Sequence, residues 1–295
     1  MSRDLLARTP RLRLLVYRAL FIAAERCPLR PLQLLAFLGG WLGWFCDGHG
    51  RRTVDANLAA LIPPGHPRAR ERAARRCYAY FGLSIVDLLA APRLRTMFER
   101  AQIVDPWGVF ADPPLQGPAI VTTVHANFET ALACTRMRGL LDEVRAISLT
   151  HDDPAIDALF HRARARYGVR SILLASGPLH SLRALREGAL LGIVGDRDYT
   201  ANGAPCRFLG RPYRLPIGPA ALAVQTGCTI HPAVLARRSH TEFVLIAGRP
   251  LRADPDLPAD ENVRALIQSL ADIYGRFLRA IPAQWVAFHP VFPHS

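Results

Sequence analysis

Short apolar runs alternate with amphipathic segments between residues 119 and 194, and this alternation constrains the fold more than any other feature of the chain. Four β-branched or aliphatic runs have the continuous apolar character of strands covered on both faces. They occupy residues 119–124, 144–148, 169–174 and 190–194. The segments between them predict helices that begin near residue 129 and cover residues 155–167 and 181–187. Strands alternating with helices imply βαβ units, so we predict an α/β fold with a mainly parallel central sheet flanked by helices.

A histidine follows the first of these runs directly. His125 ends the apolar stretch, and Glu129 comes about one helical turn later. Open α/β sheets place their ligands at the carboxyl ends of strands, where His125 is expected to lie. A carboxylate on one imidazole nitrogen fixes the tautomer and leaves the other nitrogen free to take a proton. We therefore predict that His125 and Glu129 form a pair that can activate a hydroxyl group.

The basic residues of the chain are all arginines. The formal net charge is +13 with 37 Lys plus Arg, and no lysine is present, which excludes Schiff-base lysine chemistry and a Walker A loop. Arginine suits bidentate contacts to phosphate and carboxylate, so an acidic carrier protein or an anionic membrane surface fits this charge. No zinc knuckle or RNA-binding signature occurs, and we expect no nucleic-acid partner. The absence of a His, Cys and carboxylate cluster predicts that no metal is bound.

The N-terminal region contains an apolar run over residues 32–46 that is interrupted only by Gln33. The run contains Trp41, Trp44 and Phe45 and is shorter than the roughly 20 residues needed to cross a bilayer. Its flanks carry Arg26, Arg30, Arg51 and Arg52. Tryptophan and arginine at both ends suit a helix lying at a membrane interface. A buried core helix and a transmembrane span are the alternative interpretations.

Four sequence blocks occur in an order that is typical of one family. They are Gly117–Ala133; the arginines 162, 164 and 166 ahead of Gly168; residues 195–198 with 208–212, 215–220 and 226–227; and Pro282–Trp285. With them, the chain resembles the bacterial lysophospholipid acyltransferase superfamily. The nearest branch contains the lipid A late acyltransferases and the phosphatidylinositol mannoside acyltransferases. The resemblance covers most of the chain.

The resemblance implies a role for the histidine and its acid. His125 would act as general base on an acceptor hydroxyl, and Glu129 would orient the ring and stabilise its imidazolium form. The family usually places four residues between the two, whereas Ala126, Asn127 and Phe128 make three here. We interpret this as a one-residue deletion, for which the longer glutamate side chain compensates.

The resemblance also implies a set of substrate-binding residues. They are Arg164, Asp196, Arg197, Asp198, Gly210 and Arg211. Arg164 would hold a phosphate or steady the developing oxyanion, although Arg162 and Arg166 compete for its position in the motif. Asp196 would position arginine side chains or acceptor hydroxyls, with a local ion pair to Arg197 as the alternative. Gly210 is expected to shape a turn.

We therefore expect an acyltransferase that moves a fatty acyl chain from an acyl-carrier-protein or acyl-CoA thioester to a hydroxyl of a lipid or glycolipid acceptor, such as lipid A. The thioester is a co-substrate, and no cofactor is expected. Residues 1–50 would form a membrane-interface anchor and residues 51–295 the catalytic α/β domain, on the cytoplasmic face of a bacterial inner membrane. Two alternatives stay open: an acyl-thioesterase or lipid hydrolase on the same site, and a non-catalytic lipid-binding relative.

Overall fold

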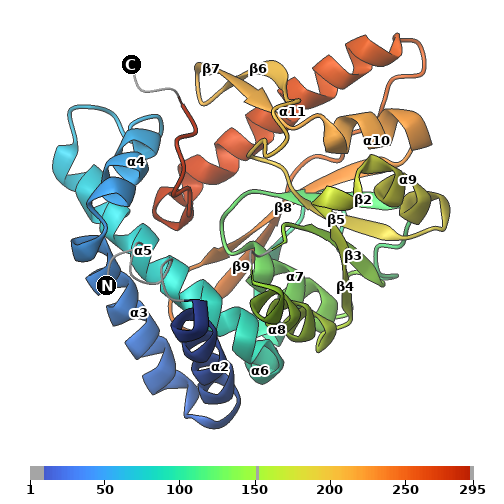
Figure 1. Cartoon of the computed structure of the whole chain (residues 1–295). Coiled ribbons are helices and arrows are strands. Elements are labelled where there is room, and N and C mark those ends of the chain that lie inside the picture. The colour runs from blue at the N-terminus through green and yellow to red at the C-terminus, as the bar shows by residue number, and fades with distance from the viewer. Residues whose placement is uncertain (1–9, 151–152, 293–295) are drawn as a thin grey trace.

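A seven-stranded sheet lies between two layers of helices (Figure 1) in the computed structural model, which describes residues 10–150 and 153–292. The strands are β1 (Gln102–Val104), β2 (Ala119–Thr123), β3 (Val144–Ser148), β4 (Val169–Leu173), β5 (Leu190–Val194), β8 (Thr229–Arg237) and β9 (Phe243–Ala247). Their order in the sheet is β1-β9-β8-β2-β5-β3-β4, and only β8 and β9 pair in antiparallel fashion. The predicted α/β fold with a mainly parallel central sheet is confirmed.

Alternate residues of the strands face two separate hydrophobic cores, which is why each strand is apolar throughout. In β2 and β5, Ala119 and Leu190 belong to one core, whereas Ile120 and Leu191 belong to the other. The first core is covered by α5 (Pro67–Ala90), α7 (Phe128–Met137) and α8 (Pro154–Ala165). The second core is covered by α9 (Pro178–Arg186), α10 (Gly218–Thr226) and α11 (Ala259–Ala280). Both cores support the edge of the sheet at which β2 and β5 end.

The predicted strands and helices are found at or near their predicted positions. The runs at 144–148 and 190–194 coincide with β3 and β5, and α7 begins one residue before Glu129. Helix α9 begins at Pro178 rather than at residue 181, because proline is well suited to the first helical position. The elements are therefore those expected of consecutive βαβ units.

A β-hairpin follows β5 and packs on α11. Its strands are β6 (Ala204–Phe208) and β7 (Arg211–Leu215), which pair in antiparallel fashion. The two turn residues, Leu209 and Gly210, both have positive φ, at 51° and 82°. Such a two-residue turn follows the right-handed twist of the strands and favours glycine. The prediction that Gly210 shapes a turn is confirmed.

The N-terminal helices pack beside α5. They are α2 (Pro10–Arg26), α3 (Leu29–Cys46) and α4 (Gly48–Leu58), and η1 (Ala91–Leu94) and α6 (Arg95–Glu99) follow α5. Helices α3 and α5 run close together (Figure 1), because Gly82 allows the backbone of Ala36 to approach. The opposite face of α3 carries exposed apolar side chains: Leu34, Leu35, Leu38, Trp41, Leu42 and Phe45. Within the described residues, no helix combines the length and the apolar character needed to cross a membrane.

Candidate active site

His125 lies directly beyond the carboxyl end of β2, in a loop whose backbone is tied to a distant segment. The backbone N–H of Val286 donates a hydrogen bond to the His125 carbonyl, with N and O 2.8 Å apart. Asn127, two residues later, adopts a left-handed conformation with φ of 49°, after which α7 begins. The His125 side chain is 17% exposed. The backbone of His125 is therefore fixed, and a small part of its imidazole is accessible to solvent.

The carboxylate that contacts His125 belongs to Asp196, which follows β5. Because β5 is the neighbour of β2 in the sheet, the ends of these two strands bring the residues together. Asp196 Oδ1 lies 2.6 Å from His125 Nδ1 and accepts the His125 backbone N–H at 3.0 Å. Asp196 Oδ2 accepts the indole N–H of Trp285 at 2.8 Å. Both oxygens of a fully buried carboxylate are thus hydrogen-bonded, and three donors fix its orientation.

The charge of Asp196 is stabilised by these contacts. Burial alone would raise the pKa of Asp196. The neighbouring His125 and the hydrogen bonds from His125 and Trp285 outweigh burial and lower the pKa below its ordinary value. Asp196 is therefore ionised at neutral pH. A carboxylate oxygen only accepts hydrogen bonds, so the Nδ1 atom of neutral His125 carries the proton and Nε2 presents a lone pair.

Glu129 does not occupy the position that the sequence predicted for it. Its carboxylate accepts hydrogen bonds from Arg164 Nε, which lies 3.1 Å and 3.2 Å from the two oxygens, and a further one from Nη2. No hydrogen bond joins Glu129 to His125 in the part of the chain that the structure describes. The left-handed Asn127 is held by Gln284, and after it the first turn of α7 directs Glu129 toward α8, where Arg164 lies. Asp196 takes the place at the ring that Glu129 was expected to fill.

The Glu129–Arg164 pair is buried between α7 and α8. Each of the two residues is 9% exposed. Burial alone would lower the pKa of Arg164, but the adjacent Glu129 carboxylate more than offsets this and raises it. Arg164 Nη1 also donates to the Ser171 hydroxyl at 3.4 Å. This arrangement joins two helices to β4, and the substrate-binding role of Arg164 stays a prediction.

Tyr199 is a member of the site that the sequence interpretation missed. Its hydroxyl lies 3.0 Å from His125 Nε2, the nitrogen that faces away from Asp196. Arg197 Nη1 donates to this hydroxyl at 3.2 Å, and its guanidinium carbon lies 4.2 Å from the centre of the Tyr199 ring. The available signal was an aromatic hydroxyl just after the residues 195–198 at a strand end. Arg197 thus packs on Tyr199 instead of forming the alternative ion pair with Asp196.

The remaining predicted residues lie around this centre. Asp198 accepts hydrogen bonds from the backbone N–H groups of Thr200 and Gly203, at 2.9 Å and 2.6 Å, and so shapes the loop after β5. Arg211 packs on Phe292, with its guanidinium carbon 5.3 Å from the ring centre. Gly210 lines a cavity of about 370 Å³ together with Arg207, Arg276 and Arg279. The lining of this cavity contains no residue of the His125 cluster, and binding of substrate by these residues stays a prediction.

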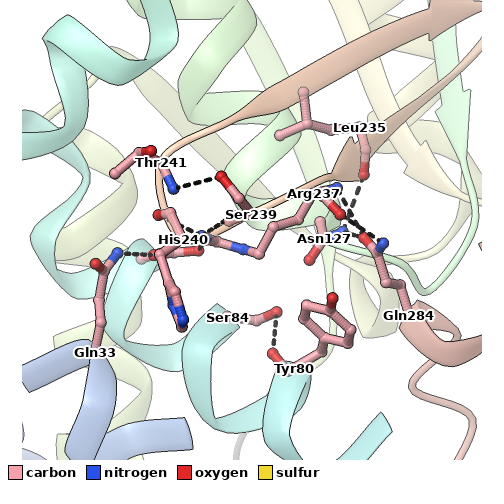
Figure 2. Close-up of polar contacts among 11 residues, drawn as sticks. Gln33, Tyr80, Ser84, Asn127, Leu235, Arg237, Ser239, His240, Thr241 and Gln284 are labelled. Atoms are coloured by element: carbon pink, nitrogen blue, oxygen red, sulfur yellow. Dashed lines mark hydrogen bonds and ion pairs between the residues drawn. The ribbon is translucent and has the colours of Figure 1, made fainter. Parts of the chain in front are cut away.

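A buried polar network holds the loop between His125 and α7 (Figure 2). Gln284 Oε1 accepts the side-chain N–H of Asn127 at 2.5 Å and the backbone N–H of Arg237 at 2.9 Å. Gln284 Nε2 donates to the Arg237 carbonyl at 2.9 Å. The Arg237 guanidinium forms an ion pair with Asp87 of α5, which accepts a further hydrogen bond from Gln33 of α3 at 3.3 Å. One network therefore extends from the N-terminal helices to the loop that carries His125.

The segment 282–286 ties these parts together. It begins with the short helix η3 (Pro282–Gln284), and each of three consecutive residues has a distinct contact. Gln284 holds Asn127, Trp285 holds Asp196, and Val286 holds the backbone of His125. Across residues 10–150 and 153–292, no group of three or more His, Cys, Asp or Glu side chains is arranged to hold a metal ion.

Comparison with known proteins decides the family. A family model described as bacterial lipid A biosynthesis acyltransferase matches residues 8–293. The chain belongs to this family. The membership agrees with the four sequence blocks, and the structure explains why the first, third and fourth occur together, since they supply His125, Asp196 and Trp285.

The proteins to which this chain is similar include phosphatidylinositol mannoside acyltransferases. One from Mycobacterium tuberculosis is 34% identical over 107 residues, which are 36% of this chain and 32% of the relative. One from Mycolicibacterium smegmatis is 32% identical over 107 residues, 36% of this chain and 33% of the relative. The matched stretch thus spans about a third of the length of these relatives. A crystal structure of the 1-acyl-sn-glycerophosphate acyltransferase of Thermotoga maritima aligns over 84% of this chain and 97% of that one, with 13% identity and a TM-score of 0.41.

Proposed function

We propose that this chain is an acyltransferase that moves a fatty acyl group from an acyl-carrier-protein or acyl-CoA thioester to a hydroxyl of a lipid or glycolipid acceptor. The observation that carries the proposal is the hydrogen-bonded chain Trp285–Asp196–His125. Asp196 Oδ1 accepts a hydrogen bond from His125 Nδ1 at 2.6 Å, so that the other ring nitrogen, Nε2, carries the lone pair. Family membership and the similarity to phosphatidylinositol mannoside acyltransferases support a lipid acceptor.

The reaction follows from this geometry. His125 Nε2 takes the proton of the acceptor hydroxyl while the hydroxyl oxygen attacks the thioester carbonyl. The carbon–sulfur bond then breaks, and the imidazolium returns its proton to the departing thiolate. The products are an ester and a free thiol. Asp196 stabilises the imidazolium during these steps, as the aspartate of the Ser-His-Asp triad does in serine proteases. The acceptor hydroxyl is the nucleophile, and no acyl-enzyme forms.

The contact between His125 and a carboxylate bears on the alternatives. A non-catalytic lipid-binding relative would be supported by an acid beyond hydrogen-bond reach of the ring. Glu129 fits that description, but Asp196 supplies the missing carboxylate from the next strand. A hydrolase on the same site would use water as the nucleophile and release free fatty acid. The product of the reaction separates a transferase from a hydrolase.

The test is an acyl-transfer assay with detergent-solubilised protein. Labelled acyl-carrier protein and labelled acyl-CoA are each offered with total lipid from a bacterial membrane, for the wild type and for His125→Ala. A labelled lipid made by the wild type and lost in the variant is the expected result, and the productive donor identifies the thioester. Free fatty acid without acylated lipid would replace the transferase with a hydrolase. No product from folded wild type with either donor would contradict both.

We also propose that α3 places the enzyme on a membrane surface. Its six exposed apolar side chains (Leu34, Leu35, Leu38, Trp41, Leu42 and Phe45) lie on one face and are 40–65% exposed. Burial of their exposed parts in the lipid interface is worth about 6 kcal/mol, at roughly 1 kcal/mol for each of the six half-exposed side chains. Arg51 and Arg75 stack on Trp44, with guanidinium carbons 4.9 Å and 4.6 Å from the ring centre, where lipid phosphates would meet them. An anionic leaflet such as the cytoplasmic face of an inner membrane suits this charge.

Flotation with vesicles tests the membrane proposal. Vesicles of phosphatidylcholine with phosphatidylglycerol should carry the wild type to the top of a density gradient, whereas the double variant Leu35→Ser and Leu42→Ser should stay at the bottom. Leu179→Ser is the matched control, because Leu179 is 74% exposed on α9, away from α3. Flotation of the double variant at the wild-type level would exclude the α3 face as the membrane surface.

A further inference from the structure

The nitrogen that must receive the acceptor hydroxyl is already occupied in this structure. The Tyr199 hydroxyl lies 3.0 Å from His125 Nε2. Because Nδ1 keeps its proton and donates it in a hydrogen bond to Asp196, Nε2 is an acceptor and the Tyr199 hydroxyl is the donor. Burial raises the pKa of the Tyr199 phenol above its ordinary value, with Arg197 opposing this effect and Asp196 adding to it. The phenol therefore keeps its proton at neutral pH and remains a donor.

Tyr199 is held in this position by side-chain contacts. Arg197 stacks on its ring at 4.2 Å and donates to its hydroxyl at 3.2 Å. The backbone on either side is fixed separately, since Asp198 accepts hydrogen bonds from Thr200 and Gly203. The Tyr199 residue is 39% exposed. The ring can rotate away from His125 by side-chain torsions alone, without any change in the loop.

One imidazole lone pair accepts one hydrogen bond at a time. A hydroxyl of the acceptor, a water molecule and the Tyr199 phenol all compete for His125 Nε2. When a thioester is bound and no acceptor is present, a base in contact with water would activate that water. The water oxygen would attack the carbonyl, the carbon–sulfur bond would break, and the products would be fatty acid and thiol. Exclusion of water from the base is what separates transfer from hydrolysis.

We propose that Tyr199 determines the specificity of the reaction for lipid hydroxyls over water, by covering His125 Nε2 until the acceptor displaces it. This inference rests on the proposed function. Tyr199 acts as a replaceable cap: its hydroxyl makes the hydrogen bond to Nε2 that a water molecule would otherwise make, and its partly exposed side chain can leave by a change of rotamer. An acceptor that is held by its own lipid contacts displaces the phenol, whereas a single water molecule does not.

Tyr199→Phe tests this cap, because it keeps the ring that stacks on Arg197 and removes only the hydroxyl. Labelled thioester is supplied to the protein in detergent micelles, with and without acceptor lipid, and both fatty acid and acylated lipid are measured. In the variant, hydrolysis without acceptor should rise about tenfold, and a larger share of turnovers should end in fatty acid with acceptor present. Tyr213→Phe is the matched control, because its hydroxyl donates to the Asp196 backbone carbonyl at 3.3 Å and not to the base; its ratio of hydrolysis to transfer should equal that of the wild type.

A second measurement needs neither donor nor acceptor. Diethyl pyrocarbonate acylates unprotonated imidazole nitrogens, and peptide mass spectrometry reports the rate at His125. This rate should be several times faster in Tyr199→Phe than in the wild type, which supports the cap even if the transfer assay fails. An unchanged rate together with an unchanged product ratio would overturn the proposal. So would loss of both products in Tyr199→Phe, or an acyl adduct on Tyr199 of the wild type, since either would give the phenol a direct part in the chemistry.

Discussion

Replacing Asp196 by asparagine should be among the most damaging conservative changes in this protein. The two oxygens of Asp196 accept three hydrogen bonds, from the backbone and Nδ1 of His125 and from Trp285. An asparagine offers one acceptor oxygen and one NH₂ group. With the NH₂ group at the Oδ2 position, it faces the indole N–H of Trp285. At the Oδ1 position it faces the backbone N–H of His125 and forces the ring into the tautomer whose Nε2 carries the proton. The base is weakened in the first orientation and lost in the second, although the shape of the side chain is kept.

The size of the loss follows from the same contacts. The change removes a charge-assisted hydrogen bond and the negative charge that stabilises the imidazolium. In serine proteases the equivalent substitution lowers kcat by about 10⁴-fold. For Asp196→Asn we expect a reduction of about 10³- to 10⁴-fold in kcat, or roughly 4–5 kcal/mol in activation free energy. The assay is the acyl transfer described above, with folding checked by circular dichroism.

Two further variants make this prediction sharp. Asp260→Asn is the matched control, because Asp260 is an exposed carboxylate that pairs with Arg264 on the first turns of α11; its activity should equal that of the wild type. Glu129→Gln separates the two candidate partners of His125 and should reduce activity far less than Asp196→Asn. Retention of a tenth or more of the wild-type rate by folded Asp196→Asn would refute the assignment of Asp196 as the partner of His125.

Three other changes have defined outcomes. Arg164→Met leaves the buried Glu129 carboxylate without its arginine and should lower the free energy of unfolding by about 3 kcal/mol in denaturant titrations, whereas adding Glu129→Leu should restore more than half of it. Trp285→Phe removes one donor to Asp196 and keeps the ring, so kcat should fall about tenfold with the melting temperature nearly unchanged; an unaltered kcat would remove the indole from the site. Burial lowers the pKa of His231 to about 4, assisted by Arg252 and opposed by Asp105, so the unfolded chain binds the extra proton first as pH falls from 6.5 toward 4, and folded protein is destabilised in that window. His231→Gln should lose about 1 kcal/mol less stability than the wild type between pH 7 and 4.5, after allowance for partial exposure of this side chain.

The parts of the fold that follow from local sequence could be predicted. The strands β3 and β5 are continuous apolar runs between helical segments, and hydrophobic periodicity identifies such runs directly. The edge formed by β8, β9 and β1 did not follow from this pattern. There β8 joins β2 in parallel and β9 in antiparallel fashion, and such pairing depends on which distant strands meet in the sheet.

In the candidate site, too, one part could be predicted from local sequence and another could not. The position of His125 at a strand end follows from the run before it. Its carboxylate partner does not, because Glu129 is close in sequence whereas Asp196 is close in space. The direction of Glu129 depends on the left-handed Asn127, which is held by Gln284 from a segment far along the chain. No local spacing could have shown that contact.

The segment 282–286 has a consequence for the synthesis of this enzyme. Ribosomes complete the strands that carry His125 and Asp196 long before they reach Gln284, Trp285 and Val286. Until those three residues dock, Asp196 lacks its indole donor, Asn127 lacks its amide partner, and the His125 carbonyl lacks the hydrogen bond from Val286. A nascent chain therefore contains His125 and Asp196 before the contacts that orient them have formed. The proposed acyl-transfer activity should appear only when this stretch has been translated and has closed on the finished sheet.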